Sequence, residues 1–177
     1  MAPFRAFVQE RIALAKRAKQ SQGPDALKDW GTMDLFYGCR RSDSDFLFRD
    51  EWSEYAKELD GKFRLHVAFS REPGMPKVYV QNLVEEHSSI VCQSLIEKKG
   101  LTPRLQGELG LEILTNIDLG HVYICGDARD MAREVEAVLV KILGNGKGGG
   151  QVEGEKVEGE KELRLLKDRK RIALDVW

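Results

Sequence analysis

The chain has little of the material that disulfide frameworks, metal sites, membrane spans and nucleic-acid surfaces require. Its 177 residues include only three cysteines and three scattered histidines, so we expect neither a disulfide framework nor a metal site. This cysteine usage favours a reducing compartment. No apolar run approaches the roughly 18 residues of a membrane span, and the N-terminus lacks a secretory signal. A net charge of −1 excludes a strongly basic surface for nucleic acid.

What remains is the composition of one ordinary soluble globular domain. Its most informative stretch is a short apolar run, Val122 to Ile124, followed by Cys125-Gly126-Asp127 and an amphipathic helical pattern. Strand, glycine turn and helix form half of a βαβ unit, with Asp127 as a candidate helix cap. Because helix N-termini bind anions, this turn is a candidate ligand site, although the same pattern also occurs where aspartate only caps a helix.

Periodicity elsewhere predicts an α/β chain. Helices are expected over 2–20, over a stripe from Phe48 to Leu59 capped by Ser42 or Asp43, and over 83–99; strands are expected near 33–37, 63–69 and 172–176. Segment 100–120 reads as a loop with one short helical turn. Segment 144–161 carries a doubled Val-Glu-Gly-Glu-Lys repeat, and we expect it to be a flexible insertion because it is too charged and too glycine-rich to order itself.

The loop after the strand at 63–69 carries a set of residues suited to a phosphate monoester, namely Ser70, Arg71, Lys77 and Tyr79. Arginine supplies a planar fork, lysine a point charge, and serine and tyrosine neutral donors. Two charge-assisted contacts of about 1.5–3 kcal/mol each would favour a phosphorylated ligand over its plain analogue by a hundredfold or more. A solvated polar loop is the alternative, and the same choice stands for Arg40 and Arg41 after the strand at 33–37.

Several stretches together resemble a known family: APFRAFVQER, FYGCRRSDSDFLFRDEWSEY, AFSRE with KVYVQ, VYICGDARDMAREVE and RIALDVW. They are similar to the C-terminal NADP(H)-binding module of diflavin reductases in the ferredoxin-NADP reductase superfamily, and most similar to the NADPH-dependent cytochrome P-450 reductase (NADPH-hemoprotein reductase) family. The motifs cover roughly two-thirds of the chain. The resemblance implies a Rossmann-like parallel sheet with helices on both faces.

The resemblance also implies a role for each matching position. The 2′-phosphate of the adenosine ribose would be held by Ser70, Arg71, Lys77 and Tyr79, with Gln81 beside them. Cys39 and Arg40 would line the path of the pyrophosphate and ribose. The nicotinamide side would be bordered by Cys125, Gly126, Asp127 and Met131. The catalytic group would comprise Cys125 and Asp175, which orient the nicotinamide during hydride transfer, and Trp177, which covers the flavin ring.

By resemblance, the chain is the NADPH-binding part of a flavin-dependent oxidoreductase. It would deliver hydride from NADPH to FAD, and electrons would leave through FMN to a heme protein such as cytochrome P-450. NADP(H) is the expected cofactor of this chain, whereas FAD and FMN belong to domains that it lacks. The expected location is the cytoplasm, or the cytosolic face of the endoplasmic reticulum. The alternatives are a catalytically incompetent nucleotide-binding fragment and a sibling diflavin reductase of the sulfite reductase flavoprotein type.

The sequence departs from the family pattern at its N-terminus. The glycine-rich turn that precedes APFR in the family, and the strand before that turn, are absent, so we expect an N-terminally truncated, partial module that is inactive alone. In the usual strand order 3-2-1-4-5 the absent strand is the central one, which would leave strands near 33–37 and 121–125 without a shared neighbour. Segments 100–120 and 144–161 look inserted relative to the family.

Overall fold

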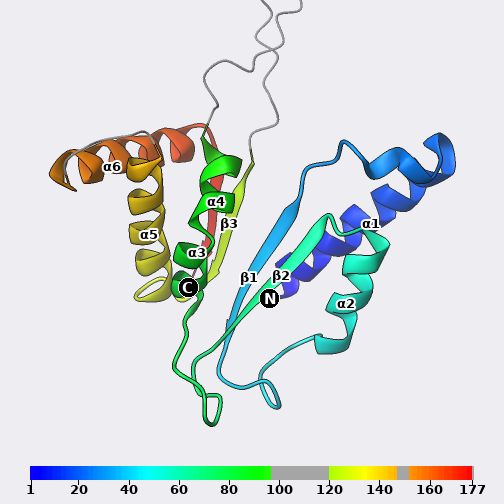
Figure 1. Cartoon of the computed structure of the whole chain (residues 1–177), viewed down its shortest axis with the longest axis horizontal. Helices are drawn as coiled ribbons and strands as arrows, with labels where there is room; N and C mark the ends of the chain where they lie inside the picture. Colours follow the sequence, from blue (N-terminus) through cyan, green and yellow to red (C-terminus); the bar gives the residue numbers. More distant parts are fainter. Residues whose placement is uncertain (97–119, 147–151, 177) are drawn as a thin grey trace, which may run out of the picture. The chain divides into compact units, whose positions relative to one another are not determined.

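The computed structural model describes residues 1–96, 120–146 and 152–176, which divide into two compact units, Met1–Leu83 and Val84–Trp177 (Figure 1). Each unit contains one pair of parallel strands accompanied by helices. The predicted α/β class with parallel strand pairing is therefore confirmed. In the described ranges the two pairs share no strand.

The first unit follows the predicted order of elements. It consists of α1 (Ala2–Gln22), the 3-10 helix η1 (Pro24–Leu27), β1 (Met33–Cys39), α2 (Arg49–Glu58), β2 (Phe63–Phe69) and the start of α3 (Val80–Glu86). Apolar side chains from α1, β1, α2 and β2 form one core, whose buried members are Val8, Ile12, Ala15, Leu27, Leu35, Trp52, Leu59 and Phe63. The helical and alternating apolar stripes of the sequence meet in this core, which fixes α1 and α2 against the strands.

The start of α2 differs from the prediction. Neither Ser42 nor Asp43 caps this helix, which begins at Arg49 after Phe48, a residue with φ 57° in the left-handed region. The two predicted caps have other partners, since the Ser42 hydroxyl donates to Glu72 and the Asp43 carboxylate accepts from Arg41. The residues between them and Arg49 form turns instead.

The single helix expected over 83–99 is two shorter ones. α3 ends at Glu86, and α4 (Ser88–Leu95) begins after His87, which occupies the N-cap position with non-helical backbone angles. The loop with one short helical turn expected over 100–120 lies outside the described residues, apart from Gly120.

The second unit is built on β3 (Val122–Gly126) and β4 (Ile172–Val176), which pair in parallel. The helix after β3 is α5 (Met131–Asn145), which begins later than the predicted start at Asp127. Asp127 does not cap it: its carboxylate accepts from the Arg129 N–H at 2.6 Å, and its carbonyl accepts from the Ala132 N–H at 3.0 Å. Asp127 therefore forms a turn ahead of the helix, and Asp130 takes the N-cap position.

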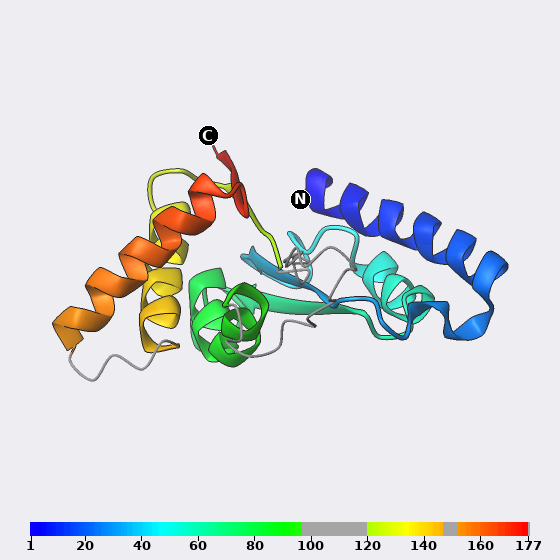
Figure 2. The same ribbon diagram turned by 90° about the horizontal axis from the view of Figure 1, so that it is seen from above.

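The prediction that segment 144–161 does not order itself is wrong for its second part. α6 (Val152–Asp168) covers the repeat and packs beside α5, as both views show (Figures 1 and 2). A Cβ on Gly144 would lie 2.2 Å from the Glu155 carbonyl oxygen, and one on Gly159 would lie 2.0 Å from that of Val140. These glycines allow the helix backbones to approach closely. Buried leucines further along α6, at 163 and 166, supply the apolar anchor.

Arg171, just before β4, is the one buried charged residue of the described chain. Its guanidinium donates to the carbonyl oxygens of Leu95 (3.1 Å), Ser94 (3.3 Å) and Gly120 (2.7 Å). Ser94 and Leu95 end α4, where free carbonyls carry partial negative charge. One cation thereby joins the C-terminus of α4 to the starts of β3 and β4.

Candidate functional site

The carboxyl ends of β1 and β2 bring the first group of predicted site residues together. The parallel ladder continues past both strands, because the Ser70 N–H donates to the Cys39 carbonyl at 3.0 Å and the Arg71 N–H donates to the Arg40 carbonyl at 2.8 Å. The Ser70 hydroxyl reaches the Cys39 carbonyl at 3.4 Å. Two segments that lie thirty residues apart in the sequence are therefore adjacent at one edge of the sheet.

The loop after β2 closes on itself and returns to the same place. The Val78 N–H donates to the carbonyl oxygen of Phe69, the last residue of β2, at 3.1 Å. Lys77 and Tyr79 flank Val78, so this bond returns them to the strand end that carries Ser70. The predicted phosphate-binding residues of this loop thus share one locality.

Two cations of this loop are available to a ligand. Arg71 and Lys77 are exposed, and their side chains make no hydrogen bond or ion pair within the part of the chain that the structure describes. The Tyr79 side chain is 46% exposed. Gln81 follows in α3 and is half-buried. An exposed pair of cations beside a phenol and a hydroxyl suits a doubly charged phosphate.

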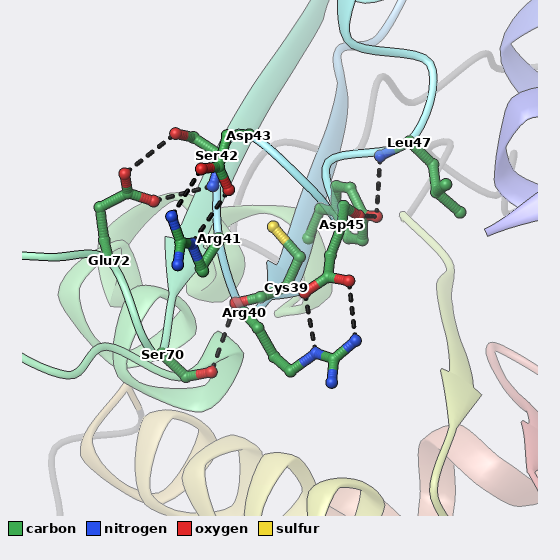
Figure 3. A network of polar contacts seen from close by, with 10 residues as sticks. Cys39, Arg40, Arg41, Ser42, Asp43, Asp45, Leu47, Ser70 and Glu72 are labelled. Carbon is green, nitrogen blue, oxygen red and sulfur yellow. Dashed lines mark hydrogen bonds and ion pairs between the residues drawn. The ribbon is translucent and has the colours of Figure 1, made fainter.

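The loop after β1 is different, because both of its arginines are paired (Figure 3). Arg40 makes a two-pronged ion pair with Asp45, with both N···O distances at 2.8 Å. Arg41 does the same with Asp43, at 3.0 and 2.6 Å. The hydrogen bond and charge of Arg40 lower the pKa of Asp45, and those of Arg41 lower the pKa of Asp43. Arg40, predicted to line the pyrophosphate path, is therefore occupied by an internal carboxylate.

Glu72 ties the two loops together. Its carboxylate accepts the Ser42 N–H at 2.8 Å and the Ser42 hydroxyl at 3.0 Å (Figure 3). Burial, followed by the carboxylates of Asp45 and Glu72, raises the pKa of the nearby Cys39 thiol to about 11. Cys39 is therefore a neutral thiol at physiological pH, which suits a packing contact rather than a nucleophile.

The second group of predicted residues lies at the carboxyl ends of β3 and β4. Cys125 pairs in register with Asp175, and the Cys125 sulfur lies 3.9 Å from a carboxylate oxygen of Asp175. Gly126 has φ 146°, and a Cβ there would lie 2.5 Å from the terminal methyl of Met131. Four predicted residues thus meet around one strand-to-helix turn.

Two further members of this predicted group stand apart. The Asp127 side chain is exposed and bonded to its own turn, and Trp177 lies outside the described residues. The predicted site residues accordingly form two groups, one in each unit.

The acidic residues of the first group were not predicted. Asp43, Asp45 and Glu72 all face arginine or serine across the two loops. The signal was present in the alternation Arg-Arg-Ser-Asp-Ser-Asp from residue 40 to 45. It could not be read as pairing without knowing how the loop turns.

Among the described ranges, no group of three or more His, Cys, Asp or Glu side chains is placed to hold a metal ion. Across those ranges, no helix combines the length and apolar character that crossing a bilayer requires.

Parallel strands whose carboxyl ends carry hydroxyls, cations and a close glycine turn are typical of nucleotide-binding α/β proteins. This chain belongs to the oxidoreductase NAD-binding domain family, whose model matches residues 1–137.

Curated relatives match over the whole chain. It is 48% identical over 181 residues to an NADPH--cytochrome P450 reductase of Phanerodontia chrysosporium, and covers 21% of that protein. It is 38% identical over 177 residues to the same-named protein of Aspergillus niger and 37% identical to that of Saccharomyces cerevisiae, covering 20% and 21% of them. The resemblance seen in the motifs is confirmed, and the chain spans about a fifth of these relatives.

Proposed function

We propose that this chain is the NADPH-binding part of a flavin-dependent oxidoreductase that passes hydride from NADPH to FAD for onward transfer to a heme protein such as cytochrome P-450. The observation that carries the proposal is the closed loop after β2, which gathers Ser70, Arg71, Lys77 and Tyr79 at the carboxyl edge of a parallel strand pair. Membership of the NAD-binding domain family and the names of the relatives support the same reading.

The chemistry of this loop fits the phosphate that distinguishes NADPH from NADH. A 2′-phosphate carries nearly two charges at neutral pH and offers three strong acceptors. Arg71 and Lys77 would neutralise it without losing an existing partner in the described part of the chain, and Ser70 and Tyr79 would donate from the side. Cys39 and Arg40, joined to this loop by the backbone ladder, would face the rest of the nucleotide.

The second group of residues would serve the nicotinamide. Bound nicotinamide supplies the hydride; the chain's own residues orient the ring and exclude water. The Cys125 thiol and the Asp175 carboxylate, 3.9 Å apart, would lie together at one edge of the ring, and Gly126 with the Met131 methyl packed over it would border the ring. Asp127 would border the same space, and Trp177 would cover the flavin until the nicotinamide displaces it.

The partners of this function are the FAD and FMN domains and a heme-protein acceptor. Hydride transfer needs donor and acceptor in contact, and these 177 residues would bind the donor, NADPH. The proposed location of the working enzyme is the cytoplasm or the cytosolic face of the endoplasmic reticulum.

The direct test is ligand-dependent melting. A ligand that binds only the folded protein increases the free energy of unfolding by RT ln(1 + [L]/Kd) and so raises the melting temperature. At about a hundred times its Kd, 2′,5′-ADP would increase that free energy by roughly 2.7 kcal/mol. We expect 2′,5′-ADP to raise the melting temperature of the purified chain and 5′-AMP, which lacks the 2′-phosphate, to raise it much less. Equal shifts with both nucleotides would contradict the proposal.

A second candidate is a nucleotide-binding module that performs no hydride transfer. It is favoured by the phosphate loop, which gathers Ser70, Arg71, Lys77 and Tyr79 within the first unit alone. The two are separated by adding the flavin domains in trans and following cytochrome c reduction with NADPH. Restored reduction supports the reductase, whereas binding of 2′,5′-ADP without reduction supports the binding module. A sibling diflavin reductase, such as a sulfite reductase flavoprotein, would differ in its preferred electron acceptor.

A further inference from the structure

We propose that Asp45 is an internal competitor for the nucleotide, a carboxylate that holds Arg40 in the place of a phosphate and thereby sets how tightly the pyrophosphate binds. This inference rests on the proposed function, because it takes Arg40 as a residue on the pyrophosphate path. It adds a residue that weakens binding to a site whose other predicted members strengthen it.

The geometry of the pair is that of a phosphate contact. Two guanidinium nitrogens of Arg40 meet two carboxylate oxygens of Asp45, both at 2.8 Å (Figure 3). A carboxylate and a phosphate can each accept two parallel N–H bonds from arginine through a pair of oxygens, so the same edge of the guanidinium can bind either one. A phosphate that binds this edge of the guanidinium, formed by Nε and Nη2, must therefore exchange with Asp45.

The carboxylate is held in place from behind. The Tyr37 hydroxyl donates to the Asp45 carbonyl at 2.7 Å and accepts the Leu47 N–H at 3.2 Å. The Phe46 ring packs between those of Tyr37 and Phe69, with centroid distances of 5.8 and 6.0 Å. These contacts hold the backbone on either side of Asp45 against β1 and β2.

Arg40 is the movable partner. Its side chain is 63% exposed, compared with 25% for Asp45. The exchange therefore consists of the arginine turning from a fixed carboxylate to an incoming phosphate. The vacated carboxylate stays nearby and repels that phosphate, which weakens binding further.

Two measurable consequences follow. Removing the charge of Asp45 frees Arg40 and removes the repulsion, so affinity for a pyrophosphate-bearing ligand rises. Binding also becomes more sensitive to salt, because Arg40 without the Asp45 carboxylate is neutralised by ions from solution, and these ions compete with the phosphates. A purely structural role for Asp45 predicts neither change.

The test compares Asp45→Asn with the unmodified chain, using NADP⁺ and 2′-AMP as probes. NADP⁺ carries the pyrophosphate that would meet Arg40, whereas 2′-AMP reports only on the Ser70–Tyr79 loop. We expect NADP⁺ to bind about three- to fivefold tighter to the variant, as the loss of an exposed ion pair allows, with a steeper salt dependence. Binding of 2′-AMP stays unchanged. Asp43→Asn removes the same charge from Arg41 and is the matched control, with NADP⁺ affinity close to that of the unmodified chain.

Each other outcome has a defined meaning. Unchanged or weaker NADP⁺ binding to Asp45→Asn, with 2′-AMP still bound, overturns the inference and leaves the proposed function standing. Equal tightening in Asp45→Asn and Asp43→Asn also overturns it, because the effect is then one of net charge. If the unmodified chain binds neither probe, the proposed function itself fails.

Two further measurements guard against a variant that does not fold. Burial is the main cause of the raised pKa of the Cys39 thiol, about 11, so this pKa must stay well above about 8.5, the value of an unfolded cysteine, in a correctly folded Asp45→Asn. In the unmodified chain, the Nε–H resonance of Arg40 must shift on addition of NADP⁺ and stay in place with 2′-AMP. If NADP⁺ binds but the Arg40 Nε–H resonance shifts with neither ligand, Arg40 does not exchange Asp45 for a phosphate.

Discussion

Replacing Arg71 with alanine tests the assignment of the phosphate loop most directly. The Arg71 guanidinium is exposed and makes no hydrogen bond or ion pair within the described ranges, and its backbone N–H, which bonds to Arg40, survives the change. The variant should keep its stability within about 0.5 kcal/mol. The lost contact to a 2′-phosphate is worth about 1.5–3 kcal/mol, which corresponds to about 10- to 150-fold in Kd.

The assay is calorimetric titration with NADP⁺ and with NAD⁺, which lacks the 2′-phosphate. We expect Arg71→Ala to weaken NADP⁺ by the full factor and NAD⁺ by less than about twofold. Arg41→Ala is the matched control, because it removes the same side chain from the neighbouring loop, where Asp43 occupies it. It should weaken neither ligand by more than about twofold.

Equal losses of NADP⁺ and NAD⁺ affinity in Arg71→Ala would refute the reasoning, since the side chain would then act on a part of the nucleotide that both ligands share. A loss as large in Arg41→Ala would refute it as well, because the effect would reflect the general charge of the site.

Three further predictions concern stability. Trp52→Ala should lower the free energy of unfolding of the first unit by about 3–5 kcal/mol in a urea titration, because Trp52 is 2% exposed in its core. Burial raises the pKa of Asp34, but hydrogen bonds from Arg64 and His66 outweigh burial, so the pKa is lowered overall. Asp34→Asn should therefore lower the free energy of unfolding by about 1 kcal/mol at pH 7. The difference between the two proteins should disappear below about pH 4, where the Asp34 carboxylate of the unmodified chain becomes protonated. Gly159→Leu should destabilise the second unit by about 1–3 kcal/mol, since its Cβ would meet the Val140 carbonyl, whereas Val157→Ala, at an exposed position, should change little in thermal melting.

The sequence sufficed for elements whose burial follows a regular period. The apolar stripe of α1 and the alternation in β2 are visible in the residues alone, and both elements lie where they were predicted. The period failed in α6, because the composition of its first half argues for disorder while its order comes from packing against α5. In the sequence, Gly159 predicts a break in a helix. In the structure, it allows α6 to lie close to α5.

The site was predictable to the extent that parallel strands end together. Residue type predicted Ser70 and Arg71 as phosphate ligands, and the family resemblance implied Cys39 near the nucleotide. The backbone ladder at the ends of β1 and β2 places these residues side by side. The pairing of Arg40 with Asp45 was not accessible, since it depends on a turn held by the Tyr37 hydroxyl. Residue type predicts which side chains could bind an anion. Only the fold shows that Arg40 is already paired with the carboxylate of Asp45.

The guanidinium of Arg171 has a consequence for how this chain tolerates change in length. Its acceptors are the carbonyl oxygens of Ser94 and Leu95 at the end of α4 and of Gly120 just before β3, so one side chain holds these two elements together. The free energy of closing a loop rises only slowly with its length, by about 0.6 kcal/mol for each doubling. A change in the number of residues between Leu95 and Gly120 should therefore cost little stability while β3, which ends at Gly126, keeps its position beside β4.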